Sequence, residues 1–174
     1  MKRLAALLLA LPAAAFAHGG ATGPDQCHVN KANTQRHCHP LEGEAEVVDG
    51  DTIVLGRRHI RLQGIDAVET AQMCTRDAKR WACGRRAAAA LVELLDGKTV
   101  SCKDVGRDGY GRTLGICSAG GVDINDWMVR EGWAVAYRRY SMSYVGAEQA
   151  ARAAGRNIWS GKFMEPESYR HRKK

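Results

Sequence analysis

Residues 44–69, EAEVVDGDTIVLGRRHIRLQGIDAVE, set short apolar runs between turn residues. Val-Val before Asp49-Gly50 and Thr-Ile-Val after it are typical of two antiparallel strands joined by a tight turn. A second turn, Gly56-Arg57-Arg58, leads into a third apolar run that ends at Asp66. This stretch therefore predicts a small, strand-rich domain whose strand ends carry polar side chains.

Acids and one arginine recur through the same stretch, at Asp49, Asp51, Arg61, Asp66 and Glu69. A hard cation such as calcium takes several oxygen ligands and accepts carboxylates readily. An arginine beside such a cation suits a phosphate, because its planar guanidinium binds two oxygens at once. The pattern indicates a site where a metal ion and a guanidinium share a phosphate.

The rest of the chain predicts helices and one further hairpin. Apolar residues at helical spacing run from Gly84 to a stop at Gly97, and residues 124–131 and 145–154 predict two more helices. Two strand-like runs, 100–104 and 112–117, flank a Gly-rich turn, which would place Cys102 opposite Cys117. Periodicity alone gives an α+β class.

Four segments resemble, in chain order, the staphylococcal nuclease (thermonuclease) family: Asp49–Thr52, Arg61–Glu69, Asp108–Arg112 and Asn157–Ser160. The resemblance runs from Glu44 to Ser160, about two-thirds of the chain. It implies an α+β domain over residues 44–162, a five-stranded OB-type β-barrel with three helices. We expect residues 18–43 to form a loop-like, Cys/His-rich segment before it.

The resemblance implies a calcium site. Its ligands would be the Asp51 and Asp66 carboxylates and the backbone carbonyl of Ala67, where the family usually has Thr. Asp49 matches a turn acid that supports these ligands without binding the metal, although an Asp-Gly turn alone would also explain it.

The resemblance also assigns catalytic and nucleotide-binding residues. Arg61 and Arg112 would hold the scissile phosphate, and Glu69 would be the candidate general base. Tyr110 and Tyr137 match tyrosines that contact the nucleotide, but either residue would serve equally well as a packing tyrosine. Gly109 stands where the family often has a basic residue.

Together with these residues, the resemblance implies a calcium-dependent nuclease that hydrolyses DNA and RNA with little sequence preference, and it further implies cleavage that leaves a 3′-phosphate. One alternative is an OB-type module that binds single strands without cutting them. Another is an exported metal-binding protein with the barrel as carrier. We expect a monomer.

The first 17 residues have the features of a signal peptide. Lys2 and Arg3 precede an Ala/Leu-rich run, and Ala15-Phe16-Ala17 provides an A-x-A cleavage site. Removal of this segment would leave 157 residues and lower the formal charge from +7 to +5. We expect export to the periplasm or the extracellular space, with no membrane anchor in the mature chain.

Six cysteines in an exported chain favour disulfides, although the count alone allows 15 connectivities. Short spacings favour Cys27–Cys38, Cys74–Cys83 and Cys102–Cys117. The first pair has an alternative, because cysteine together with histidine also suits zinc. The histidines of that possible second metal site are His28, His37 and His39.

Residues 163–174 form a basic C-terminal tail. Arg170, Arg172, Lys173 and Lys174 contribute four positive charges. Because the end of this tail has no apolar residues, we expect it to be mobile, to raise non-specific affinity for nucleic acid and to leave the chemistry unchanged.

Overall fold

The computed structural model describes residues 27–29, 34–38 and 41–172, and the chain divides into two units, 1–39 and 40–174. The predicted signal peptide, residues 1–17, lies outside the described residues. None of the helices in the described ranges is both long and apolar enough to cross a membrane.

The first unit contains a short antiparallel pair, β1 (Cys27–Val29) and β2 (Arg36–Cys38). The prediction of a loop-like segment is wrong for these two strands. Their register places Cys27 opposite Cys38 and His28 opposite His37. The side chains of these four residues, and His39 as a whole, lie outside what the structure describes. The Cys27–Cys38 disulfide and the zinc site therefore stay predictions.

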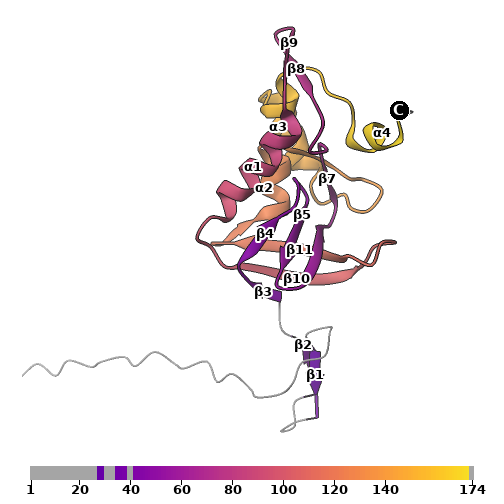
Figure 1. Cartoon of the computed structure of the whole chain (residues 1–174). Coiled ribbons are helices and arrows are strands. Elements are labelled where there is room, and N and C mark those ends of the chain that lie inside the picture. Colours follow the sequence, from indigo (N-terminus) through magenta and orange to yellow (C-terminus); the bar gives the residue numbers. More distant parts are fainter. Residues whose placement is uncertain (1–26, 30–33, 39–40, 173–174) are drawn as a thin grey trace, which may run out of the picture. The chain divides into compact units, whose positions relative to one another are not determined.

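The second unit is built on a curled, half-barrel sheet (Figure 1). Its strand order is β3-β10-β11-β6-β5-β4, and β12 pairs with β11. Neighbouring strands are antiparallel except β6 and β11, which are parallel. The strands are β3 (Leu41–Gly43), β4 (Ala45–Val47), β5 (Thr52–Leu55), β6 (Arg58–Leu62), β10 (Val100–Arg107), β11 (Thr113–Ala119) and β12 (Val122–Asp123).

The α+β prediction is confirmed, with a larger sheet than expected. The sheet of the described region has seven strands rather than five. It gains β12, and it gains β3, which pairs with β10 and lies before the predicted domain start at Glu44. Two small pairs lie beside the sheet, β7 (Ile65–Ala67) with β13 (Ala134–Ala136) and β8 (Cys74–Arg76) with β9 (Lys79–Trp81).

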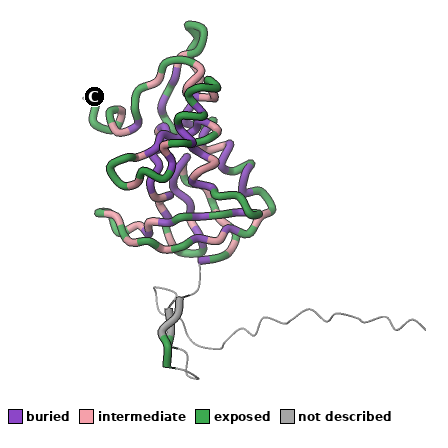
Figure 2. Tube along the Cα trace, turned by 180° about the vertical axis from the view of Figure 1, so that it is seen from behind, coloured by how far each residue is buried: buried purple, intermediate pink, exposed green. Residues whose placement is uncertain are grey.

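Helices follow the predicted positions closely. The three expected ones are α1 (Cys83–Leu95), α2 (Ile124–Arg130) and α3 (Val145–Ala153). The turn η1 (Asn157–Ser160) and a fourth helix, α4 (Pro166–His171), were not expected. The buried positions in Figure 2 gather inside the second unit, where apolar faces of the sheet and helices meet. Leu91 of α1, Ile60 of β6 and Met128 of α2 are fully buried there.

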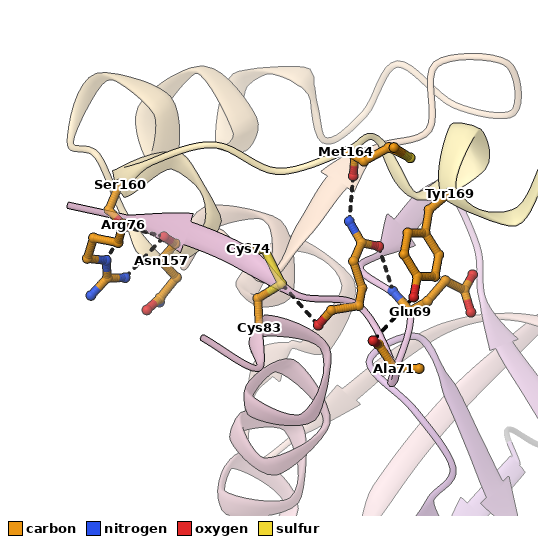
Figure 3. Close-up of a disulfide and its surroundings, with 10 residues drawn as sticks. Glu69, Ala71, Cys74, Arg76, Cys83, Asn157, Ser160, Met164 and Tyr169 are labelled. Carbon is orange, nitrogen blue, oxygen red and sulfur yellow. Dashed lines mark hydrogen bonds between the residues drawn. A yellow bond between two sulfur atoms is a disulfide. The ribbon is translucent and has the colours of Figure 1, made fainter. Parts of the chain in front are cut away.

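Two of the predicted disulfides are present. Cys102 lies opposite Cys117 in the β10–β11 register, and the two sulfurs are bonded. Cys74 and Cys83 are also bonded, which joins β8 to the start of α1 (Figure 3). Disulfides of this kind are typical of proteins that fold in an oxidising compartment.

Two glycines allow the close approaches on which the site depends. A Cβ at Gly50 would lie 2.7 Å from the Cβ of Ala67, so the β4–β5 turn can approach β7 only without a side chain there. A Cβ at Gly84 would lie 1.7 Å from the carbonyl oxygen of Glu69. The first turn of α1 therefore packs directly on the backbone of the segment after β7.

Candidate active site

The β4–β5 turn places the buried carboxylate of Asp51 against β7. Asp49 Oδ1 accepts the backbone N–H of Asp51 at 2.9 Å, which stabilises the turn. Asp51, 7% exposed, turns inward, and its Oδ2 accepts the backbone N–H of Ala67 at 2.7 Å. Asp49 thus acts as a turn former here, and its support of a metal site stays a prediction. Asp66 lies beside Ala67 in β7 and is also buried.

Arg61 brings the two carboxylates together. It lies in the middle of the sheet, on β6, opposite Thr52 of β5. Its Nη2 lies 3.1 Å from Asp51 Oδ2 and 3.0 Å from Asp66 Oδ1. Both carboxylates therefore face one cationic atom. Burial raises the pKa of the Asp51 carboxyl to about 7, against the lowering effect of Arg61.

This carboxylate pair fits a hard divalent cation. Two carboxylate oxygens that already converge on one positively charged nitrogen can face a metal ion in the same way, and an all-oxygen donor set suits calcium. A cation would also offset the cost of ionising buried Asp51. Among the described residues no group of three or more His, Cys, Asp or Glu side chains could hold a metal. A metal at Asp51 and Asp66 would therefore need backbone oxygens, such as that of Ala67, and water.

Hydrogen bonds to Gln72 hold the backbone of Glu69, whose side chain is 34% exposed. Gln72 Oε1 accepts the Glu69 N–H at 3.2 Å, and the Gln72 N–H donates to the Glu69 carbonyl at 2.7 Å. Gln72 Nε2 in turn donates to the Met164 carbonyl at 2.6 Å (Figure 3). Together with the contact at Gly84, these bonds fix the backbone of the candidate base. No sequence signal marked Gln72 for this positioning role.

Arg112 is oriented by a neighbour to which the sequence analysis gave no role. Asp108 Oδ2 accepts Arg112 Nε at 2.7 Å, and Asp108 Oδ1 accepts the backbone N–H groups of Tyr110 and Arg112, each at 2.9 Å. Arg112 Nη1 then donates to Thr52 Oγ1 at 3.3 Å, and Thr52 Oγ1 donates to Asp51 Oδ1 at 3.3 Å. A hydrogen-bonded chain therefore connects Arg112 with the carboxylate pair. The i, i+4 spacing of Asp108 and Arg112 was the available signal.

The C-terminal segment enters the same site. Arg170 of α4 contacts both oxygens of Asp66 at 2.9 Å and Glu69 Oε1 at 2.8 Å. The prediction of a mobile basic end that does not pack, made for residues 170–174, is therefore wrong for Arg170. The sequence does contain a signal for helix α4. Proline and acids favour helix starts, as at Pro166 and Glu167, and basic residues favour helix ends, as at Arg170 and His171.

The two tyrosines differ in their surroundings. Tyr110 is 90% exposed, and its ring lies 5.7 Å from the Arg112 guanidinium carbon. It is thus free to meet a base, and its alternative as a packed core residue is wrong. Tyr137 is half-buried, packs edge-on against Tyr140 and donates from its hydroxyl to Glu167 Oε1 at 3.2 Å. The structure therefore gives Tyr137 a packing role, and its nucleotide contact stays a prediction.

Comparisons with known proteins show the family to which this chain is similar. A family model described as staphylococcal nuclease homologue matches residues 59–161, which include Arg61, Asp66, Glu69 and Arg112. Succinoglycan biosynthesis protein ExoI of Rhizobium meliloti (strain 1021) is 32% identical in an alignment of 164 residues that covers 83% of this chain and 86% of that protein. An "uncharacterized endonuclease" of Escherichia coli O157:H7 is 37% identical in an alignment of 145 residues that covers 78% of this chain and 89% of that protein. The "probable staphylococcal-like nuclease CAN2" of Oryza sativa subsp. japonica is 32% identical in an alignment of 124 residues that covers 69% of this chain and 31% of that protein.

Proposed function

The chain belongs to the staphylococcal nuclease family and is a nuclease, and from this premise we propose that it is an exported, calcium-dependent enzyme that hydrolyses phosphodiester bonds of DNA and RNA with little sequence preference. The OB-type barrel predicted from the sequence is the fold of this family's domain. Export is supported by the two disulfides and by the signal-like residues 1–17.

One observation carries the proposal: the convergence of Asp51 and Asp66 on a single Arg61 nitrogen, with Arg112 connected to the same pair through Thr52. Two carboxylates supply a cation site, and two guanidinium groups supply donors for phosphoryl oxygens. A module that only bound nucleic acid would not need to bury paired carboxylates beside its arginines, because carboxylates repel phosphate.

Asp51, Asp66 and the backbone of Ala67 would hold the calcium ion, which when bound polarises the phosphoryl group and lowers the pKa of water. Arg61 and Arg112 would neutralise the charge that develops on the phosphoryl oxygens in the transition state. Glu69, whose side chain is 34% exposed, would accept a proton from the attacking water. Exposed Tyr110 would stack on a base next to the scissile bond. None of these contacts reads a base edge, which agrees with low sequence preference.

Cleavage of supercoiled plasmid and of a long RNA tests this function. We expect the wild-type protein to cut both with calcium and to stop in excess chelator. Glu69→Gln should lower kcat about 10²- to 10³-fold, the range seen when one such transition-state group is removed. Its matched control is Glu93→Gln on the exposed face of α1, which should leave kcat unchanged.

Undiminished cleavage in chelator would refute calcium dependence. If Glu69→Gln cut at the wild-type rate, Glu69 would not be the base. Binding of both nucleic acids without cleavage at any calcium concentration would favour the non-catalytic module.

A further inference from the structure

The α4 segment occupies the cation-binding side of the candidate site with its own positive charge. The Nη1 and Nη2 atoms of Arg170 each lie 2.9 Å from a different oxygen of Asp66. Nη1 also lies 2.8 Å from Glu69 Oε1. A bidentate ion pair of this kind is the strongest arrangement of a guanidinium and a carboxylate. Arg170 therefore takes up both oxygens of one proposed calcium ligand and one oxygen of the proposed base.

Arg170 reaches these carboxylates because α4 is docked on the segment that follows β7. The Tyr169 hydroxyl donates to the Ala71 carbonyl at 3.2 Å (Figure 3). Glu167 accepts the Tyr137 hydroxyl, and Pro166 at the start of α4 is buried. Just before α4, the carbonyl of Met164 is bonded to Gln72. The helix is thus fixed at several points, and Arg170 is held over the site.

We propose that Arg170 is an internal competitor of the metal ion. In the metal-free protein its guanidinium pairs with Asp66 and Glu69, and calcium must displace it from Asp66 before the site is complete. The physical reason is that each Asp66 oxygen already faces an Arg170 nitrogen, and a cation in the same place would repel the guanidinium. This inference rests on the proposed function, because it takes Asp66 as a calcium ligand.

The competition should weaken calcium binding by a measurable factor. Within residues 41–172, removal of Arg170 leaves the Asp66 carboxylate paired with Arg61 and removes the ion pair of the Glu69 carboxylate. The Arg170 side chain is 36% exposed, so solvent screens part of the attraction. We therefore expect Arg170→Ala to bind calcium about tenfold more tightly than the wild type.

Isothermal titration of calcium into the full-length mature protein measures this effect without relying on activity. Arg172→Ala is the matched control, because it removes the same charge from the same segment. Arg172 donates to the Tyr169 carbonyl and packs on the Tyr169 ring, and it pairs with no carboxylate of residues 41–172. We expect its calcium Kd to stay within twofold of wild type. Arg170→Lys should fall between wild type and Arg170→Ala, because an ammonium cannot cap both Asp66 oxygens.

A second measurement uses the unmodified protein and so does not depend on the folding of a variant. Phenylglyoxal labels accessible guanidinium groups, and peptide mass spectrometry reports each site. Calcium should raise the labelling of Arg170 severalfold and leave that of Arg172 unchanged.

Equal calcium affinities for wild type and Arg170→Ala, or weaker binding by the variant, would overturn the proposal. So would Arg170 labelling that calcium does not increase. The plasmid assay separates these failures from failure of the proposed function. If the wild type cleaves plasmid in the presence of calcium but binds calcium no more weakly than Arg170→Ala, only the competitor proposal fails. If Arg170→Ala binds calcium more tightly but neither protein cleaves, only the proposed nuclease function fails.

Discussion

Asp108→Asn tests whether Asp108 positions Arg112 for catalysis. Asparagine keeps one carbonyl-type oxygen, so it can still accept the backbone N–H groups of Tyr110 and Arg112 and preserve the turn. Its amide group would replace Oδ2, which now accepts Arg112 Nε at 2.7 Å. The variant therefore removes the orienting bond with little change in shape. Hydrogen bonds from Arg112 lower the pKa of Asp108 despite the opposing effect of burial, so the wild-type carboxylate stays ionised at neutral pH.

The magnitude follows from the strength of this one bond. A hydrogen bond to a charged group contributes about 1.5–3 kcal/mol. The side chains of Arg112 and Asp108 are 31% and 16% exposed, so screening reduces the figure to about 1–2 kcal/mol. Because about 1.4 kcal/mol corresponds to a factor of ten, kcat should fall about 5- to 30-fold. Arg112→Lys, which removes the guanidinium itself, should cost about 10²- to 10³-fold.

Steady-state cleavage of a defined oligonucleotide at saturating calcium gives kcat and KM for each variant. Asp104→Asn is the matched control. Asp104 lies in the same hairpin and makes similar bonds, since it accepts Arg107 Nη1 at 2.7 Å and the backbone N–H of Gly106, but its ion pair is separate from that of Arg112. We expect its kcat to be unchanged.

The double variant Asp108→Asn/Arg112→Lys should be no slower than Arg112→Lys alone, because Asp108 acts through Arg112. A full additional loss in the double variant would show that Asp108 acts independently of Arg112. A wild-type kcat for Asp108→Asn, or an equal loss in Asp104→Asn, would refute the positioning role.

Two further predictions concern the framework of the site. In a denaturant titration, Gly84→Ala should destabilise the protein by about 3 kcal/mol, because the new Cβ would collide with the Glu69 carbonyl, and it should also lower kcat. The control is Gly146→Ala on α3, which has open space around it and should be neutral or stabilising in the same titration. Replacement of both Cys102 and Cys117 by alanine should cost about 3 kcal/mol, the chain-entropy value for a closed loop of 15 residues, and lower Tm by about 10 °C in calorimetry. An unchanged Tm in that double variant would contradict the entropic argument.

The sequence predicted the parts of the fold that local chemistry determines. Alternating apolar residues around Asp49-Gly50 were enough to place the β4–β5 hairpin, and helical spacing was enough to place α1. The Cys102–Cys117 pair followed from the symmetry of two strands about one turn. Each of these features depends on residues close together in the chain, so a pattern in the sequence reports it directly.

The candidate site was predictable only in part, because its residues come from distant segments. The resemblance identified Asp51, Arg61 and Asp66, yet the close approach of the β4–β5 turn to β7 depends on Gly50 facing Ala67. Gln72 holds the backbone of nearby Glu69, but its own side chain is anchored by the Met164 carbonyl, 92 residues later in the chain, and no local pattern reports that anchor. Side chains whose partners come from another part of the fold leave no periodic signal.

The error over the tail shows why net charge alone is a weak guide to function. The basic residues at the end of the 163–174 tail predict a mobile segment, because charged side chains in water gain little from packing. That argument fails when buried or half-buried carboxylates lie within reach of the tail, since they attract any cation that the chain can deliver. Asp66 and Glu69 supply that attraction, and the docked α4 supplies Arg170. In a nuclease of this design, a basic segment near the end of the chain has two competing anionic partners: the nucleic acid and the carboxylates of the proposed metal site.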